Sequence, residues 1–131
     1  MARIKLLIDT DIFIDYLKGI SAAKALFRST EVDIYCSVLT KKELLNKPGL
    51  KDSERKKIIN IFKRLKTITI DSDISLKYSD LLAKYHDNGL KPPDAIIAAT
   101  AWSKKLPLLT RNRRHFSYIE EIRISPIYNQ S

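Results

Sequence analysis

Short apolar runs alternate with stretches of helical periodicity along most of this chain. Four runs predict buried strands, at Ile4–Ile8, Ile34–Cys36 (with Val38 as an outer limit), Thr67–Ile70 and Leu106–Leu109, and a weaker run predicts a fifth at Ile122–Ile124. Ile and Leu predominate, and apolar and polar residues do not alternate cleanly within the runs. This pattern is expected of strands that are covered on both faces.

Helical periodicity fills the gaps between these runs. Apolar residues recur at intervals of three and four over 58–65 and 74–85, so each segment presents one apolar face. Shorter helices are expected at Ile12–Leu17, Ala22–Phe27 and Leu39–Leu45. The segment Ala95–Trp102 is apolar almost all round, which predicts a helix buried against the sheet.

The alternation of strands and helices predicts right-handed βαβ crossovers and an α/β fold with a central, mainly parallel sheet of about five strands. A length of 131 residues predicts a single domain, residues 1–131. Neither loop signal, Lys47–Gly49 or Asn88–Pro93, is long enough to be an interdomain linker. Sheets of this kind carry their functional sites beyond the carboxyl ends of the strands.

Composition narrows the functions to consider. The chain has 24 Lys and Arg against 15 Asp and Glu, and the net charge of +9 favours a polyanionic partner, nucleic acid before an acidic membrane surface. The single cysteine, Cys36, excludes an internal disulfide and a cysteine-based zinc site, and it favours a reduced, cytoplasmic location. No stretch approaches the roughly 18 apolar residues of a membrane span, and residues 1–17 lack the pattern of a signal peptide.

Polar residues follow the expected strands or open the expected helices. We expect the sheet to bring them to one edge. Two carboxylates about 4 Å apart repel by roughly 4 kcal/mol at an effective dielectric constant near 20, so a group of three needs a cation or altered protonation. Oxygen ligands suit Mg²⁺ or Mn²⁺, which polarises a phosphoryl oxygen and activates water. The residues concerned are Asp9, Thr10, Asp11, Glu43, Asp94, Thr110, Arg111 and Asn112.

Simpler roles stay open for each carboxylate taken alone. Asp9 or Asp11 can cap the helix expected at Ile12, and Thr40-x-x-Glu43 matches a capping box. Asp94 after two prolines suits a helix start, where the macrodipole also favours its ionised, metal-binding form. Their joint occurrence at successive strand or helix ends favours one shared site over separate caps.

Four segments carry these residues in order: Leu7–Leu17, Ser37–Leu44, Pro93–Ala101 and Leu108–Phe116. Together they resemble the PIN-domain nucleases, in particular the VapC-type toxins of prokaryotic toxin–antitoxin modules, over nearly the whole chain. The resemblance implies a three-layer α/β/α fold and a metal-dependent endoribonuclease that leaves a 5′-phosphate and a 3′-hydroxyl on RNA. It also implies inhibition by a cognate antitoxin and assembly as a homodimer.

The same resemblance implies that Asp9, Glu43 and Asp94 form a catalytic Mg²⁺ or Mn²⁺ site. The family often has a fourth acid where Asn112 or His115 stands, and this chain has none at either position. Asn112 can still ligate a metal or orient water through its carbonyl oxygen, so it remains a catalytic candidate. We hypothesise that Asp11 partly compensates for the missing charge.

Other residues near the expected site suit a phosphate-bearing substrate. The hydroxyls of Thr10 and Thr110 can donate to a phosphate, although a cap or turn role is equally open. Three arginines flank the expected site and can hold phosphates through charge-assisted hydrogen bonds: Arg111, Arg113 and Arg114. Lys41 and Lys42 flank Glu43 in the same way. His115 suits a general base, but packing or capping is the commoner role. The basic groups Arg55–Lys57, Lys63–Arg64 and Lys104–Lys105 are expected to form solvated surfaces, and no interleaving of basic and aromatic residues predicts a stacking surface.

Two other functions stay open at this point. In a phosphoacceptor receiver domain, Asp71 would receive the phosphate while Asp9 and Asp11 held Mg²⁺. That interpretation lacks the lysine that such a domain needs after its last strand, and it leaves Glu43 and Asp94 without a role. The alternative is a PIN-like module with a decayed site that binds RNA or a protein partner, which the missing fourth acid favours.

Overall fold

The computed structural model describes residues 3–126, and its elements follow the predicted alternation. The strands are β1 (Ile4–Ile8), β2 (Val32–Ser37), β3 (Lys66–Ile68) and β4 (Leu108–Leu109). The helices are α1 (Thr10–Leu17), α2 (Ser21–Arg28), α3 (Val38–Leu45), α4 (Asp52–Phe62), α5 (Ser72–Lys84) and α6 (Pro92–Lys104), with 3-10 turns η1 (His86–Asn88) and η2 (Arg113–His115). Among the described residues, no helix combines the length and apolar character needed to cross a membrane.

The strands form one parallel sheet in the order β3-β2-β1-β4. The predicted sheet of about five strands therefore has four in the described chain. The candidate fifth strand, Ile122–Ile124, contributes only an isolated bridge between Leu108 and Ile124. The reason is the brevity of β4: its two residues follow Pro107, which has no backbone N–H to donate, and leave few groups for a further strand to pair with.

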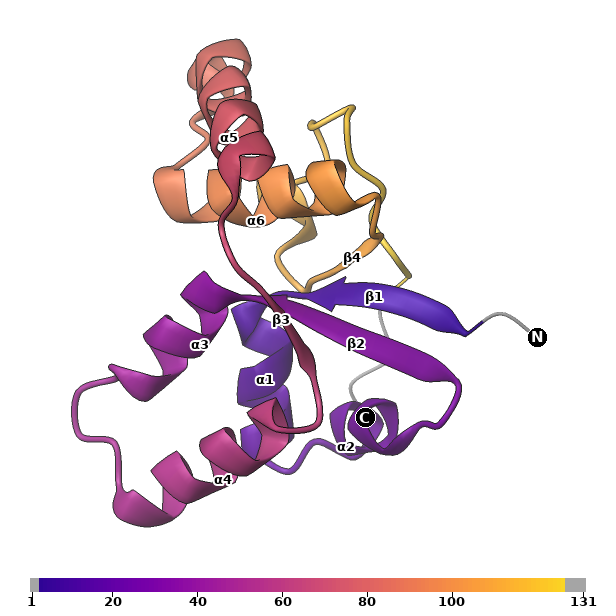
Figure 1. The fold of residues 1–131 in the computed structure, drawn as a ribbon, viewed down its shortest axis with the longest axis vertical. Helices are drawn as coiled ribbons and strands as arrows, with labels where there is room; N and C mark the ends of the chain where they lie inside the picture. Colours follow the sequence, from indigo (N-terminus) through magenta and orange to yellow (C-terminus); the bar gives the residue numbers. More distant parts are fainter. Residues whose placement is uncertain (1–2, 127–131) are drawn as a thin grey trace.

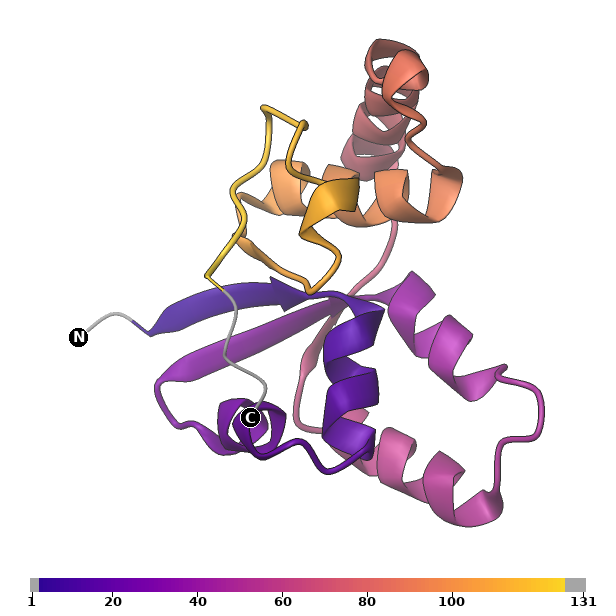
Figure 2. The same cartoon turned by 180° about the vertical axis from the view of Figure 1, so that it is seen from behind.

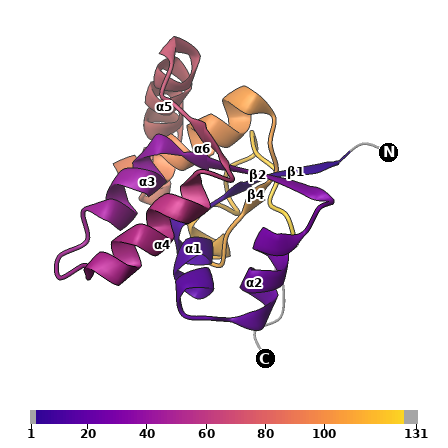
Figure 3. The same ribbon diagram turned by 60° about the horizontal axis from the view of Figure 1, so that its bottom comes forward.

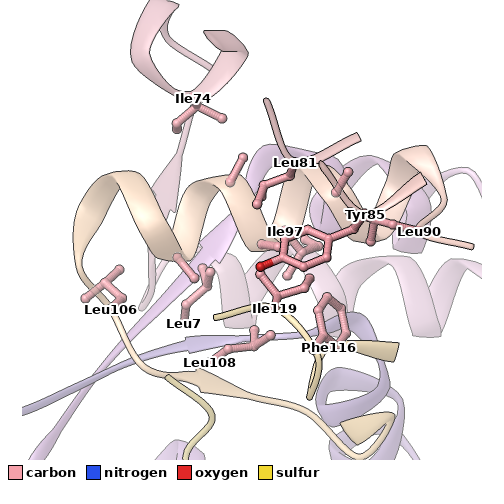
Figure 4. Packing of buried hydrophobic residues seen from close by; sticks show 14 residues of the cluster. Leu7, Ile74, Leu81, Tyr85, Leu90, Ile97, Leu106, Leu108, Phe116 and Ile119 are labelled. Carbon is pink, nitrogen blue, oxygen red and sulfur yellow. The ribbon is translucent and has the colours of Figure 1, made fainter. Parts of the chain in front are cut away.

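Helices cover both faces of the sheet, as the three-layer prediction required. In Figure 1, α5 and α6 lie above the sheet, and α1, α2 and α4 lie below it. Side chains along β1 point alternately to the two faces of the sheet, where two hydrophobic cores lie. Leu7 packs in the core with α5 and α6, whereas Leu6 and Ile8 pack in the core with α1 to α4. Figure 4 shows the first core around Leu7, and Figure 3 shows α1 and α2 side by side under the sheet.

The carboxyl ends of the central strands meet the starts of three helices. β1 leads directly into α1 and β2 into α3, so these helices begin at the same edge of the sheet. The first turn of α6 lies at this edge too, and Figure 2 shows it from behind on the same side as α1 and α3. Local sequence fixes the helix starts: the side chains of Asp9 and Ser37 cap α1 and α3, and Pro92 occupies the first turn of α6.

Hydrogen bonds and an ion pair hold the segment after η2 against the carboxyl-terminal end of α5, and this positions η2. The Tyr85 hydroxyl donates to Glu121 Oε1 at 2.6 Å and accepts from the backbone N–H of Glu120 at 3.0 Å. Lys84 pairs with the other Glu121 oxygen at 2.6 Å. Phe116 and Ile119, fully or almost fully buried, pack into the core beside Tyr85 (Figure 4).

Candidate active site

Asp9 lies at the centre of the polar edge. It follows β1, is only 8% exposed, and accepts two short hydrogen bonds. The backbone N–H of Thr10 donates to its Oδ1 at 2.8 Å, and the Thr110 hydroxyl donates to its Oδ2 at 2.9 Å. Thr110 follows β4, the neighbour of β1, so adjacent parallel strands bring these two residues together. Asp9 is thus both the cap predicted for α1 and a fixed carboxylate at the edge.

Glu43 and Asp94 approach Asp9 from two helices. Glu43 is an exposed residue in the last turns of α3, and Asp94 lies in the first turn of α6 with its side chain 29% exposed. The capping-box interpretation of Glu43 is wrong, because α3 begins at Val38 and Ser37 caps it through a bond from the Leu39 N–H.

The charges of Asp9 and Asp94 act on the neighbouring carboxylates of the candidate site. Burial raises the pKa of Asp9, the negative charge of Asp94 raises it further, and the hydrogen bonds from Thr110 and Thr10 partly offset both effects. Burial likewise raises the pKa of Glu43, and the charges of Asp9 and Asp94 add to the rise, against a lowering by the Thr10 hydroxyl. Neighbouring negative charge therefore adds to the cost of ionising Asp9 and Glu43.

This crowding has the chemistry of a divalent cation site. Three carboxylates supply only oxygen atoms, the donors that Mg²⁺ and Mn²⁺ prefer, and a cation would relieve the repulsion that raises the pKa of Asp9 and Glu43. Within residues 3–126, no three Asp, Glu, His or Cys side chains are already drawn together as a complete ligand set. The oxygen chemistry of the three side chains still suits Mg²⁺, which commonly keeps several waters among its ligands.

A second acidic cluster lies behind Asp9, built around Asp11. The Arg111 N–H donates to Asp11 Oδ2 at 2.8 Å, and the Arg111 guanidinium pairs at 2.8 Å with Asp15, whose side chain is 2% exposed. Burial and the nearby Asp9 charge raise the pKa of Asp11 to about 6. Asp11 Oδ1 is buried and has no hydrogen-bond partner in the described chain. No pattern in the sequence singled out Asp15 for this pairing, because its partner lies in a distant loop.

The loop after β4 contains the remaining predicted site residues. The Asn112 N–H donates to Thr110 Oγ1 at 3.0 Å, so this residue supports Thr110 through its backbone. Arg113 donates to the carbonyl of Ser125 at 3.0 Å. His115 Nδ1 lies 3.2 Å from Asp94 Oδ2, and Arg114 lines the same small hollow beside Asp94, about 170 Å³ in volume.

Of two other predicted residues, Thr10 lies next to Asp9 and Glu43, whereas Asp71 lies at the start of α5. Thr10 begins α1 and donates its hydroxyl to Thr40 of α3 at 3.3 Å, which ties the two helices together below the carboxylates. Asp71 caps α5 by accepting from the Ile74 N–H and pairs with Lys104 at 2.6 Å. The candidate phosphoacceptor of the receiver interpretation is therefore used as a helix cap.

Comparison with known proteins identifies this arrangement. Residues 6–122 match the PIN domain family. The chain belongs to the PIN domain family. The matched stretch includes every element that supplies the three carboxylates. Membership in the PIN family excludes the interpretation as a receiver domain.

Two further comparisons agree with membership in the PIN family. The chain is 31% identical over 120 residues to ribonuclease VapC1 of Methanocaldococcus jannaschii, covering 89% of this chain and 82% of that protein. A toxin–antitoxin complex from Klebsiella pneumoniae contains a chain with 28% identity and a TM-score of 0.76, covering 96% of this chain and 98% of that one. The fold alone is shared with VapBC2 of Rickettsia felis, solved bound to a promoter DNA fragment, at a TM-score of 0.82, 19% identity, and coverage of 96% of this chain and 100% of that one.

Proposed function

We propose that this PIN-domain protein is an endoribonuclease, the toxin of a toxin–antitoxin pair, and that it hydrolyses RNA phosphodiester bonds with the help of Mg²⁺ or Mn²⁺. The observation that carries the proposal is that Asp9, Glu43 and Asp94 come from three separate elements and that the charges of Asp9 and Asp94 raise the pKa of carboxylates beside them. Repulsion between neighbouring carboxylates disfavours their ionised forms, so this grouping is not explained by stability of the fold. The names of the relatives, a ribonuclease and a toxin–antitoxin complex, support the same function.

Asp9, Glu43 and Asp94 are the residues that would hold the divalent ion. Such an ion would supply polarisation of a phosphoryl oxygen and activation of a water molecule. Thr110 orients Asp9 through its hydroxyl and is itself oriented by the Asn112 N–H. The protein contributes a fixed carboxylate geometry, which is the usual requirement for such chemistry.

We assign contacts with the RNA substrate to the basic residues beside Asp94. Arg114 and Lys91 line the hollow next to Asp94 and His115, where they can hold the phosphates that flank the cleaved bond. Arg113 donates to the Ser125 carbonyl and Arg111 pairs with Asp15, so these two arginines support the loop that carries Thr110. We assign direct phosphate binding to Arg114 first.

The antitoxin is the second proposed partner. Next to Glu43, a largely apolar hollow of about 310 Å³ lies among α1, α3 and α4, and Ile14, Leu44 and Ile58 are among its lining residues. Ile14 is an exposed apolar residue there, 40% accessible, which suits burial by an apolar protein segment. An antitoxin seated in this hollow would reach the edge of the carboxylate site.

The test is RNA cleavage by the purified chain in the presence of Mn²⁺, with and without chelator, alongside the Asp94→Asn variant. We expect cleavage by the wild type, loss with chelator, and loss in Asp94→Asn at unchanged thermal stability. The matched control is Asp80→Asn, which removes an exposed carboxyl of α5 remote from the edge. No cleavage by the wild type, or equal cleavage by Asp94→Asn, would refute the proposal and favour a binding module.

A further inference from the structure

A second hollow, about 550 Å³ in volume, lies on the α6 face of the sheet near the amino-terminal start of β1. Its cationic wall is formed by Arg3, Lys5, Lys104, Lys105 and Arg123, and we call it the amino-end hollow. No carboxylate lines it. The sequence places these cations in three separate stretches, so only the fold shows that they share one surface.

The cations of the amino-end hollow are not all neutralised. Arg3 pairs with Asp33 at 2.7 Å, and Lys104 pairs with Asp71 at 2.6 Å. Lys5, Lys105 and Arg123 form no ion pair with any residue between 3 and 126. Three uncompensated charges around one concave surface attract a polyanion in preference to a single carboxylate.

The floor of the hollow is apolar and aromatic. Ile4 is 56% exposed at its edge, and Tyr35, Ile68, Leu106 and Pro107 complete it. Next to it, the Lys66 ammonium lies 5.3 Å from the centre of the Tyr35 ring, which adds a further cation. A cationic wall over an apolar floor matches a nucleotide, whose phosphate is anionic and whose base has flat, apolar faces.

Lys105 stands in a backbone conformation that normally selects glycine. It ends α6 with φ of 55°, in the left-handed region, and its N–H bonds to carbonyls at the end of that helix. A non-glycine residue there costs about 1 kcal/mol. The lysine side chain stands between this hollow and the adjoining one beside Trp102, because it lines both. A strained lysine at a shared ridge is consistent with a use for its charge.

The amino-end hollow is separate from the carboxylate site. Asp9 follows Ile4 by five steps of extended chain, a span of about 16 Å. Ligands bound in the two places are therefore distinct groups, or distant parts of one long molecule.

We propose that the amino-end hollow is a second binding site for single-stranded RNA, which holds a part of the substrate away from the cleaved bond. This inference rests on the proposed ribonuclease function for the identity of the nucleic acid. Single-stranded RNA is favoured over a duplex because only unpaired bases can enter the hollow and contact the floor around Tyr35. An acidic protein segment would use the cations but would leave the aromatic and apolar floor unmatched.

The test measures binding of a fluorescent single-stranded RNA by anisotropy, with chelator present so that no cleavage occurs, over a series of salt concentrations. The test variant is Lys105→Ala with Arg123→Ala. The control, Lys56→Ala with Lys63→Ala, removes the same charge from exposed positions on or just after α4, on the opposite face of the sheet. Lys5→Ala is a second test variant on β1 that leaves the end of α6 intact. Wild-type RNA cleavage with Mn²⁺ is measured in parallel.

We expect the test variant to bind RNA about 25-fold more weakly than the wild type near 0.1 M salt, with a salt slope smaller by about 1.4, since each lost single-strand phosphate contact removes about 0.7. Lys5→Ala should show about half of that change in slope, and the control double variant little change. Equal binding by the test and control double variants would overturn the hollow as an RNA site, as would equal losses with duplex DNA or polyglutamate. If the wild type failed to cleave RNA while the test variant still lost RNA binding, the proposed function would fall and the hollow would stand.

Discussion

The raised pKa of Asp11 gives a stability prediction with a definite sign. Its pKa of about 6 in the folded chain, against 3.8 for the ordinary side chain, arises from burial first and then from the charge of Asp9. Between these two values the folded protein holds a proton that the unfolded chain has released. Asp11 therefore stabilises the fold below about pH 4, and this contribution is lost as the pH rises through 6.

The size of the effect follows from the same two values. Each pKa unit corresponds to 1.36 kcal/mol, and the part of the shift that falls between pH 5 and 7.5 is worth about 1.5 kcal/mol. Replacing Asp11 by Asn keeps an oxygen that can accept from the Arg111 N–H and removes the titration. From pH 5 to 7.5, the difference in free energy of unfolding between Asp11→Asn and the wild type should therefore change by about 1.5 kcal/mol in favour of the variant. This change with pH does not depend on how much the substitution itself alters stability.

The assay is urea denaturation at several pH values with chelator present, comparing the wild type, Asp11→Asn and the control Asp80→Asn. The control removes an exposed carboxyl, and its profile should run parallel to that of the wild type. A wild-type profile parallel to that of Asp11→Asn would show that Asp11 does not titrate in this range. That result would contradict the burial and charge crowding described behind Asp9.

Three further substitutions test separate parts of the account. Thr110→Val removes the donor to Asp9 and should cost about 1 to 2 kcal/mol by urea denaturation while weakening Mn²⁺ binding; unchanged Mn²⁺ affinity would show that Thr110 does not orient Asp9. Arg111→Ala should destabilise the fold by about 1 to 3 kcal/mol because it removes the cation paired with buried Asp15, and a neutral result would contradict a structural role for that pair. Lys105→Gly should raise stability by up to about 1 kcal/mol while lowering RNA affinity, whereas a loss of stability would contradict strain at this residue.

The strand and helix content could be predicted because the hydrophobic pattern encodes it. A strand covered on both faces could be predicted at Leu6, Leu7 and Ile8, because their side chains enter two different cores. The fifth strand was predicted wrongly at Ile122–Ile124, where apolar residues serve packing and backbone pairing is limited to one bridge. Periodicity records burial, and it does not report whether a neighbouring strand is long enough to pair.

The placement of polar residues after the strands could be predicted because strand ends of a parallel sheet share an edge. The charge of Asp94 acts on Asp9, and both charges act on Glu43, while a metal site shared by the three carboxylates stays a prediction. The pairing of Arg111 with Asp15 could not be foreseen, since it joins α1 to a loop 96 residues away and no local pattern requires it. The amino-end hollow was missed for the same reason: its cations are spread along the chain, and Lys104–Lys105 looked like an ordinary solvated pair.

The central claim is that Asp9, Glu43 and Asp94 hold one divalent ion in common. The most direct measurement is a titration of the metal-free chain with Mn²⁺ in the absence of RNA, with the free ion followed by electron paramagnetic resonance. We predict one site in the wild type and affinities at least about tenfold weaker in each of Asp9→Asn, Glu43→Gln and Asp94→Asn, with Asp80→Asn unchanged. Wild-type affinity in any of the three ligand variants would contradict a shared ion.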